Sequence, residues 1–255
     1  MKYIQSYYTD IGIKRKSNQD SLAMLKADTE YGEVLLAVLC DGMGGYQFGE
    51  LASKTCVKRF VKWFKEEFPI LLYEEMTFEA LKREWTKIVR ECNEVLVKYG
   101  ERTNSELGST LTAFLFVDDV YYAVQVGDSR GYVINEGVRQ ITRDHSLLAA
   151  EIEKGTITKE EARNDKRINI LLECVGITRG INMDFYTGQV FPNSTFLLCS
   201  DGLWHKIAEE EMQHYLSGSY MKDNKVMRMH LNFLVETAKD RGEKDNISAI
   251  GITPM

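Results

Sequence analysis

Residues 34–45 read VLLAVLCDGMGG, an uninterrupted apolar run that ends in an aspartate and a glycine-rich turn. The run from Val34 to Cys40 contains no polar residue, which is typical of a strand buried on both faces of a sheet. Asp41 follows at the end of that strand, where an ionised carboxylate is costly unless it is paired or binds a metal ion. The stretch therefore predicts a buried sheet with an acidic residue at its rim.

Aspartates recur at the ends of other predicted strands, each beside a small or turn-forming residue. They are Asp128 in VGDSR, Asp201 in CSDG and Asp245 in KDNI, and Asp20 in SNQD directly precedes a further apolar segment. Any one of them is typical of an ordinary turn, because Asp bonds its own backbone and a following Gly tolerates positive φ. Several carboxylates that meet at strand ends would repel one another without cations, however. The set, taken with Asp41, therefore favours a metal centre.

Oxygen ligands indicate which metals such a centre would take. The four histidines show no His-x-His or His-Glu-x-x-His spacing, and hard oxygen ligands suit Mg²⁺ or Mn²⁺ better than Zn²⁺. Two such ions about 3.5–4 Å apart can bind a phosphoryl oxygen and lower the pKa of a shared water. This predicts hydrolysis of a phosphate ester by direct attack of water, without a nucleophilic Cys or Ser.

Two further features fit a phosphate site. Arg15 lies five residues before Asp20, and its planar guanidinium matches phosphate bidentately, although on its own it would be taken as a solvated member of the basic run 14–16. Gly42 and its neighbouring glycines are also typical of a flexible loop, but glycine lets the backbone approach a metal so that a main-chain carbonyl becomes a ligand. These glycines do not form a Walker A loop, because the Gly-Lys-Ser/Thr ending is missing.

The rest of the chain predicts an α+β fold. Helices are expected at 50–64, 77–99, 208–216 and 226–241, with Gly100 ending the second. Strands are expected at 3–12, 34–40, 111–117, 120–126, 131–135, 138–141, 195–199 and 247–252. Strands mostly follow strands and helices come in pairs, which favours antiparallel sheets with segregated helices. With only three prolines and no linker, residues 1–255 are expected to form one domain.

Composition limits the classes of function. Apolar residues make up 44% and charged residues 27% of the chain, and the net charge is −6. An acidic chain is a poor candidate for nucleic-acid binding, and it lacks the polybasic element of a membrane-surface protein. The longest apolar run is far shorter than the roughly 20 residues of a membrane span, and residues 1–6 do not show the pattern expected of a secretion signal. The five scattered cysteines indicate buried residues in a reducing compartment, so the cytoplasm is expected.

A series of short motifs follows in a fixed order along the chain. They are Gly12, Arg15 and NQD at 18–20, DGMGG at 41–45, GST at 108–110, GDSRG at 127–131, SDGLW at 200–204 and DN at 245–246. This series resembles the metal-dependent serine/threonine protein phosphatase family, protein phosphatase 2C, and the DGMGG form is similar to its bacterial branch. The resemblance implies a four-layer α-β-β-α sandwich of two antiparallel sheets flanked by helix pairs. It also implies a binuclear Mn²⁺ or Mg²⁺ site at one end.

By matching motif, the resemblance implies roles for individual residues at the two ions. Asp41 is expected to bridge them. Asp201 and Asp245 complete the protein ligands of one ion. The Gly42 carbonyl binds the other ion, with Asp20 as a ligand or directly behind one.

Further roles follow from the same resemblance. Asp128 matches a residue that holds a third, weaker ion together with Asp201. Arg15 matches the phosphate-binding arginine, and Asn246 is expected to orient the preceding aspartate or its loop. Residues 144–176, a polar segment with short helical pieces, correspond to a mobile flap beside the active site, where substrate choice is made.

Several residues depart from the family pattern, and two of these departures lie in the DGMGG motif and directly after SDGLW. Met43 occupies the position of a histidine that is proposed as general acid in the animal branch, which leaves proton donation to the leaving group unassigned. His205 follows Trp204 where Asp is frequent. Neither departure touches the metal carboxylates.

The expected function is that of a cytoplasmic signalling phosphatase that acts on phosphoserine and phosphothreonine in proteins. A serine/threonine kinase is among the candidate partners, and the protein is expected to be a monomer. One alternative is a pseudophosphatase that keeps the fold as a binding module, which the retained carboxylates disfavour. Another is a different two-metal hydrolase such as a nuclease, which the lack of basic clusters disfavours. Metal titration separates the first two readings, and a panel of phosphopeptide and nucleic-acid substrates separates the first from the third.

Overall fold

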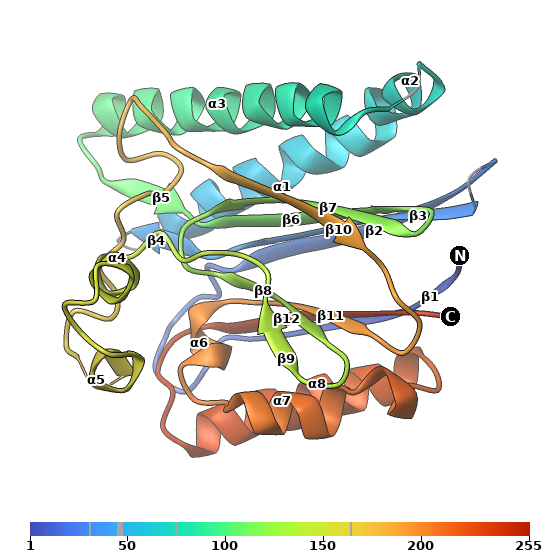
Figure 1. The fold of residues 1–255 in the computed structure, drawn as a ribbon. Coiled ribbons are helices and arrows are strands. Elements are labelled where there is room, and N and C mark those ends of the chain that lie inside the picture. Colours follow the sequence, from blue (N-terminus) through green and yellow to red (C-terminus); the bar gives the residue numbers. More distant parts are fainter. Residues whose placement is uncertain (31, 45–47, 75, 164) are drawn as a thin grey trace.

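A computed structural model describes residues 1–30, 32–44, 48–74, 76–163 and 165–255. Two five-stranded antiparallel sheets lie face to face, and helices cover the outer face of each sheet (Figure 1). The predicted α+β class and the four-layer α-β-β-α arrangement are therefore confirmed.

The first sheet has the strand order β10-β7-β6-β3-β2. Its strands are β2 (Ser21–Thr29), β3 (Gly32–Cys40), β6 (Leu111–Val117), β7 (Val120–Val126) and β10 (Asp184–Gln189). Every residue of β3 after Gly32 is buried, as the continuous apolar run predicts. Strands on both sides of β3 pair with its backbone, since Leu36 lies opposite Leu25 on β2 and Leu115 on β6.

The second sheet has the order β1-β12-β11-β8-β9. Its strands are β1 (Tyr3–Asp10), β8 (Arg130–Ile134), β9 (Val138–Gln140), β11 (Thr195–Cys199) and β12 (Ile247–Pro254). A short ladder of β4 (Gly42–Gly44) with β5 (Leu107–Ser109) extends beyond the rim of the first sheet. This ladder immediately follows Asp41, so it fixes the backbone at the end of β3.

Helices form the two outer layers (Figure 1). The first sheet is covered by α1 (Phe48–Glu66), α2 (Phe68–Tyr73) and α3 (Phe78–Thr103), and the second by α6 (Asp201–Trp204), α7 (Glu209–Leu216) and α8 (Asn224–Asp240), with a 3-10 turn at Gly218–Tyr220. Two short helices, α4 (Leu147–Glu153) and α5 (Lys159–Arg163), lie outside both layers, at the end of the sandwich where β4 and β5 lie.

One helix end differs from the prediction. The α3 helix begins as expected, since the Thr77 side chain accepts a hydrogen bond from the backbone of Ala80. It does not end at Gly100, however, but continues to Thr103, and Asn104 adopts the left-handed conformation that ends it. Gly100 is needed instead for close packing, because a Cβ there would lie 2.7 Å from the Ser105 carbonyl oxygen.

Apolar side chains gather in three layers between the four layers of secondary structure. One cluster lies between α1, α3 and the first sheet, and another between the second sheet and α7 and α8. The cluster between the two sheets is rich in aromatic rings, with Phe116 and Phe196 edge to face at 5.0 Å. All five cysteines are buried, as predicted, and none of them forms a disulfide. Within the described residues, no helix has an apolar stretch long enough to cross a bilayer.

Candidate metal centre

The predicted site aspartates lie at strand ends, as the sequence pattern indicates. Asp41 directly follows β3, and Asp201 directly follows Ser200 at the end of β11 and begins α6. Asp245 lies two residues before β12, and Asp20 directly precedes β2. The two sheets therefore both contribute acids to one rim of the sandwich.

Electrostatic interaction among the acids shows that the structure brings them together. Burial raises the pKa of Asp41 well above its ordinary value, and the charges of Asp20, Asp201, Asp245 and Asp128 raise it further. Like charges that perturb one another in this way are typical of a site that binds cations.

Two members of the cluster titrate near neutrality. The pKa of Asp20 is raised to about 7, chiefly by burial and also by the charge of Asp201, although hydrogen bonds from Ser248 and Ser200 lower it. The pKa of Asp201 is also raised to about 7, by burial and by the charges of Asp245 and of Glu243. The ionised form of this cluster is therefore costly without a positive partner.

Unsatisfied oxygens provide a test of whether the residues fit metal ions. Among the described side chains, Asp20 Oδ1 and Asp201 Oδ1 are buried without a hydrogen-bond partner. The other Asp20 oxygen accepts a hydrogen bond from Ser200 Oγ at 3.0 Å, so the carboxylate is oriented and one oxygen stays open. Carboxylate oxygens of this kind suit Mg²⁺ or Mn²⁺. In the part of the chain that the structure describes, no three His, Cys, Asp or Glu side chains already stand in the geometry of a closed metal site, so ion binding would require side-chain rotation.

The backbone of Asp41 is held by the GST motif at 108–110. Asp41 donates its N–H to Thr110 Oγ1 at 2.9 Å and its carbonyl accepts from Thr110 N at 2.9 Å. Ser109 Oγ donates to the same carbonyl at 3.0 Å. These contacts fix the rim at which the Asp41 carboxylate projects, and they give the GST motif a function that the sequence alone does not assign.

Asn246 fixes the loop that carries Arg15 and Asp20. Its Oδ1 accepts from Gln19 N at 2.8 Å, and its Nδ2 donates to the carbonyls of Ile11 and Ser17 at 2.8 and 3.1 Å. The side chain is 2% exposed. Asn246 therefore fixes residues 11–19, a loop that the sequence did not indicate, and its own N–H also contacts the preceding Asp245, so its expected role stays a prediction.

Arg15 reaches the acidic cluster. Its Nη2 lies 2.5 Å from Asp245 Oδ2, while Asp245 Oδ1 accepts from Asn246 N at 2.8 Å. The guanidinium is about half exposed, so it can also face a ligand from solvent. Arg15 thus pairs with a predicted site carboxylate, and its phosphate contact stays a prediction.

Gly42 lies where two backbones meet. A Cβ on Gly42 would lie 2.1 Å from the carbonyl oxygen of Gly49 and 2.6 Å from that of Gln19, so only glycine fits. Its N–H donates to Gln19 O at 3.2 Å. The predicted carbonyl contact with an ion stays a prediction, and Gly45 of the same motif lies outside the described residues.

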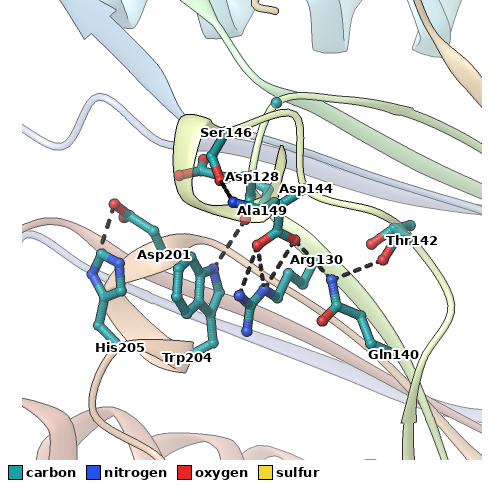
Figure 2. Close-up of polar contacts among 12 residues, drawn as sticks. Asp128, Arg130, Gln140, Thr142, Asp144, Ser146, Ala149, Asp201, Trp204 and His205 are labelled. Atoms are coloured by element: carbon teal, nitrogen blue, oxygen red, sulfur yellow. Dashed lines mark hydrogen bonds and ion pairs between the residues drawn. The ribbon is translucent and has the colours of Figure 1, made fainter. Parts of the chain in front are cut away.

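Asp128 lies at the edge of the cluster, between β7 and β8, in a network of polar contacts (Figure 2). Its carbonyl accepts from Trp204 Nε1 at 3.0 Å, and the Arg130 guanidinium lies 3.5 Å from the centre of the Trp204 ring. Arg130 also forms a fork with Asp144, whose nearest contact is 2.7 Å. Burial and the charge of Asp201 raise the pKa of the Asp128 carboxyl.

His205 is a buried neighbour of the cluster (Figure 2). Its Nδ1 lies 3.9 Å from Asp201 Oδ2, and its Nε2 is buried with no partner among the described residues. Burial lowers the pKa of His205 to about 4, so the ring is neutral at pH 7 and is poorly suited to act as a general acid.

The predicted flap, 144–176, is tied at its start by His145 N, which donates to Gly127 O at 2.8 Å. Leu172 N donates to His145 O at 2.8 Å, which closes the segment on itself. Beyond that point Val175 and Ser109 exchange two backbone hydrogen bonds of 2.9 Å. The segment therefore begins and ends next to residues that fix the acidic cluster.

Comparison with known proteins bears on this arrangement. The family model described as "Protein phosphatase 2C" matches residues 13–248. The chain belongs to the protein phosphatase 2C family. Among its relatives, the serine/threonine phosphatase stp of Listeria innocua is 32% identical over 96% of this chain and 93% of its own length. Protein phosphatase PhpP of Streptococcus pneumoniae is 30% identical over 95% of this chain and 94% of its own. The predicted enzyme class, a protein-serine/threonine phosphatase of the bacterial branch, is confirmed.

Solved structures of protein phosphatase 2C-type enzymes share the fold. The serine/threonine phosphatase Stp1 from Staphylococcus aureus superposes with a TM-score of 0.84 at 28% identity, over 98% of this chain and 94% of that one. The catalytic domain of PstP, in complex with two manganese ions, superposes with a TM-score of 0.79 at 25% identity, over 99% of both chains. The PstP structure therefore shows that the shared fold holds two manganese ions in that protein.

Two contributors to the site are not foreseen from the sequence. Ser200 donates to Asp20, and its position inside the quoted SDG motif was the available signal. Glu243 is buried, accepts the N–H groups of Lys244 and Asp245, and adds negative charge near Asp201. In the sequence, the one indication that Glu243 belongs to the site is its position two residues before Asp245.

Proposed function

We propose that this protein phosphatase 2C member hydrolyses phosphoserine and phosphothreonine in proteins at a binuclear Mn²⁺ or Mg²⁺ site, with a third, weaker ion as a further expectation. The observation that carries the proposal is the cluster of buried aspartates whose pKa values are raised by burial and by one another, with two carboxylate oxygens left without partners. Such a cluster is stabilised by cations, and its all-oxygen ligands select hard ones.

The residues that would hold the ions follow from the motifs. Asp41 would contact both ions. Asp201 and Asp245 would supply the remaining protein ligands of one ion. The Gly42 carbonyl would be a ligand of the other ion, with Asp20 beside it. When bound, the two ions would supply a water nucleophile of lowered pKa and offset the charge of the phosphoryl oxygens.

The protein's own groups position the substrate. Arg15 would bind the phosphate through its fork, and its present partner Asp245 would turn to a metal ion. Asn246 orients both through the loop it clamps and through its own N–H. With Met43 apolar and His205 neutral at pH 7, neither side chain is assigned as proton donor to the leaving group.

The wider setting is part of the same proposal. We place the substrate phosphoproteins, with a serine/threonine kinase among them, in the cytoplasm, and we propose a monomer that acts as one domain, 1–255. Residues 144–176 would form a flap at which substrates are selected. Support comes from the anchoring of that segment beside the acidic cluster, and from relatives named as serine/threonine phosphatases.

The test is hydrolysis of a phosphothreonine peptide by EDTA-treated protein, with and without Mn²⁺. Mn²⁺ should restore turnover in the unchanged chain and not in Asp41→Asn. A matched control is Asp119→Asn, which removes the same charge from the exposed β6–β7 turn and should retain full activity. If the folded protein binds Mn²⁺ yet releases no phosphate from any phosphopeptide or nucleotide offered, a binding module replaces the hydrolase.

A further inference from the structure

We propose that Trp204 is a positioning residue that sets the place of Asp128 relative to Asp201, and thereby the affinity for an ion held between these two aspartates. Because this inference rests on the proposed function, it concerns the weakest of the expected ions. Trp204 contacts no substrate or reacting atom in this reading, and it acts through the backbone of Asp128.

The indole joins two segments that are distant in sequence. Trp204 lies on α6, three residues after Asp201, so the two side chains share one short, buried helix. Its Nε1–H donates to the Asp128 carbonyl at 3.0 Å, across 76 positions of sequence. The β8–β11 pairing, with Arg130 opposite Cys199, sets the approximate distance between the two segments, and this hydrogen bond fixes α6 against the β7–β8 connection.

A guanidinium lies against the Trp204 ring (Figure 2). Arg130 lies 3.5 Å from the centre of the Trp204 ring, close enough for a strong cation–π contact. Arg130 is itself fixed, because it pairs with both oxygens of Asp144 and donates to Tyr132 Oη at 3.0 Å. With its face stacked and its edge hydrogen-bonded, the indole has little freedom to turn away from Asp128.

The other tryptophans show that this arrangement is particular to position 204. Trp63 and Trp85 are fully buried in the layer between α1, α3 and the first sheet. Their Nε1 atoms have no hydrogen-bond partner among the described residues. Substitution of either by Phe therefore changes packing without removing a hydrogen bond, which makes them matched controls.

Removal of the indole N–H should weaken ion binding and leave the chemistry intact. Groups that orient metal ligands typically change metal affinity about 10–100-fold when they are removed. In Trp204→Phe the ring that stacks on Arg130 is kept, while the Asp128 carbonyl loses its donor. We expect the weakest Mn²⁺-binding event to become about tenfold weaker, and the tighter events to keep their affinities.

The experiment is calorimetric titration of Mn²⁺ into the EDTA-treated full chain, unchanged and as Trp204→Phe, with Trp85→Phe as control. Turnover of a phosphothreonine peptide is measured across the same Mn²⁺ range. In Trp204→Phe the Mn²⁺ concentration for half-maximal turnover should rise about tenfold, while kcat at saturating Mn²⁺ stays within about twofold of the unchanged chain. Trp85→Phe should lose thermal stability and keep its Mn²⁺ affinities.

Unchanged Mn²⁺ affinities in folded Trp204→Phe would overturn the inference, and so would an equal loss in Trp85→Phe. If Trp204→Phe does not fold, Arg130→Lys replaces it, because lysine keeps the charge but loses both the planar stack and the fork with Asp144. Arg130→Lys should weaken the same binding event, and unchanged affinity there is equally decisive against the proposal. Absence of Mn²⁺-dependent turnover in the unchanged chain would instead count against the proposed function.

Discussion

Replacement of Asn246 by alanine tests how the loop with Arg15 is held at the acidic cluster. The change removes three hydrogen bonds at once, from Gln19 N and to the carbonyls of Ile11 and Ser17. A buried hydrogen bond contributes about 1 kcal/mol, and the stranded backbone groups add to the cost. We therefore expect Asn246→Ala to lower the free energy of unfolding by about 3 kcal/mol. For a chain of this size that corresponds to a fall in Tm of roughly 6–12 °C.

Asn93 offers a matched control for this substitution. Like Asn246 it is 2% exposed. It accepts from Gly176 N at 2.7 Å and donates to the carbonyls of Thr178 and Arg179 at 2.8 and 3.4 Å. Asn93→Ala should therefore lose a similar amount of stability, at a loop that carries none of the proposed metal ligands.

Stability and turnover are to be measured on both variants, by urea unfolding and by phosphothreonine-peptide hydrolysis at a temperature where both are folded. Asn246→Ala should lose kcat/KM on the order of 100-fold, because a displacement of about 1 Å at a catalytic group has that effect. Asn93→Ala should stay within a few-fold of the unchanged chain. Equal activities in the two variants, or an unaltered Tm in Asn246→Ala, would refute the role assigned to this side chain.

Three further outcomes are expected. Asp41→Asn should abolish turnover yet raise the Tm of the EDTA-treated protein at pH 7, because it removes a carboxyl whose ionised form is disfavoured by burial and by its neighbours; a lower Tm would contradict the electrostatic account. The pKa of Asp201 rises from 3.8 to about 7 on folding, so the folded protein binds more protons than the unfolded chain between these values. The free energy of unfolding without metal should therefore fall as pH rises from about 4 to about 7, and Mn²⁺ should reverse the loss; urea unfolding at pH 5 and 7 measures part of this fall, and a flat profile would argue against it. Gly42→Ala should cost about 1–3 kcal/mol, since its Cβ would lie 2.1 Å from the Gly49 carbonyl oxygen, whereas Gly137→Ala meets no atom within 4 Å and should be neutral in thermal unfolding.

Central strands could be predicted from the sequence because burial on both faces leaves a continuous apolar pattern. The predicted bounds 111–117, 120–126 and 195–199 are those of β6, β7 and β11. The edge strand β10 escaped prediction, since its residues, DFYTGQ, are only half-buried or exposed and alternate weakly. Its place in the sheet depends on pairing with β7 rather than on its own pattern.

The acids of the site could be predicted for a related reason: each stands in a short local motif at a strand end. The contacts that hold them could not be predicted, because the two partners of each contact are far apart in sequence. Asn246 contacts residues more than 200 positions earlier, and the Trp204 indole donates across 76 positions. Nothing in the local spacing of a lone Asn or Trp indicates such a partner.

The origin of the acids in two different sheets has a mechanical consequence. Asp41 extends from the first sheet, whereas Asp201 and Asp245 belong to the second. The spacing of the strand ends that carry them is therefore set by the thickness of the apolar layer between the sheets, about 10 Å in packed sheets, and the side chains of the acids extend toward one another across it. Phe116 and Phe196 meet edge to face in that layer and act as a spacer. The packing of the interior of the sandwich thus determines how far apart the ligands at its rim lie. A cavity created in that interior would therefore alter ion coordination, although no core residue contacts the ions.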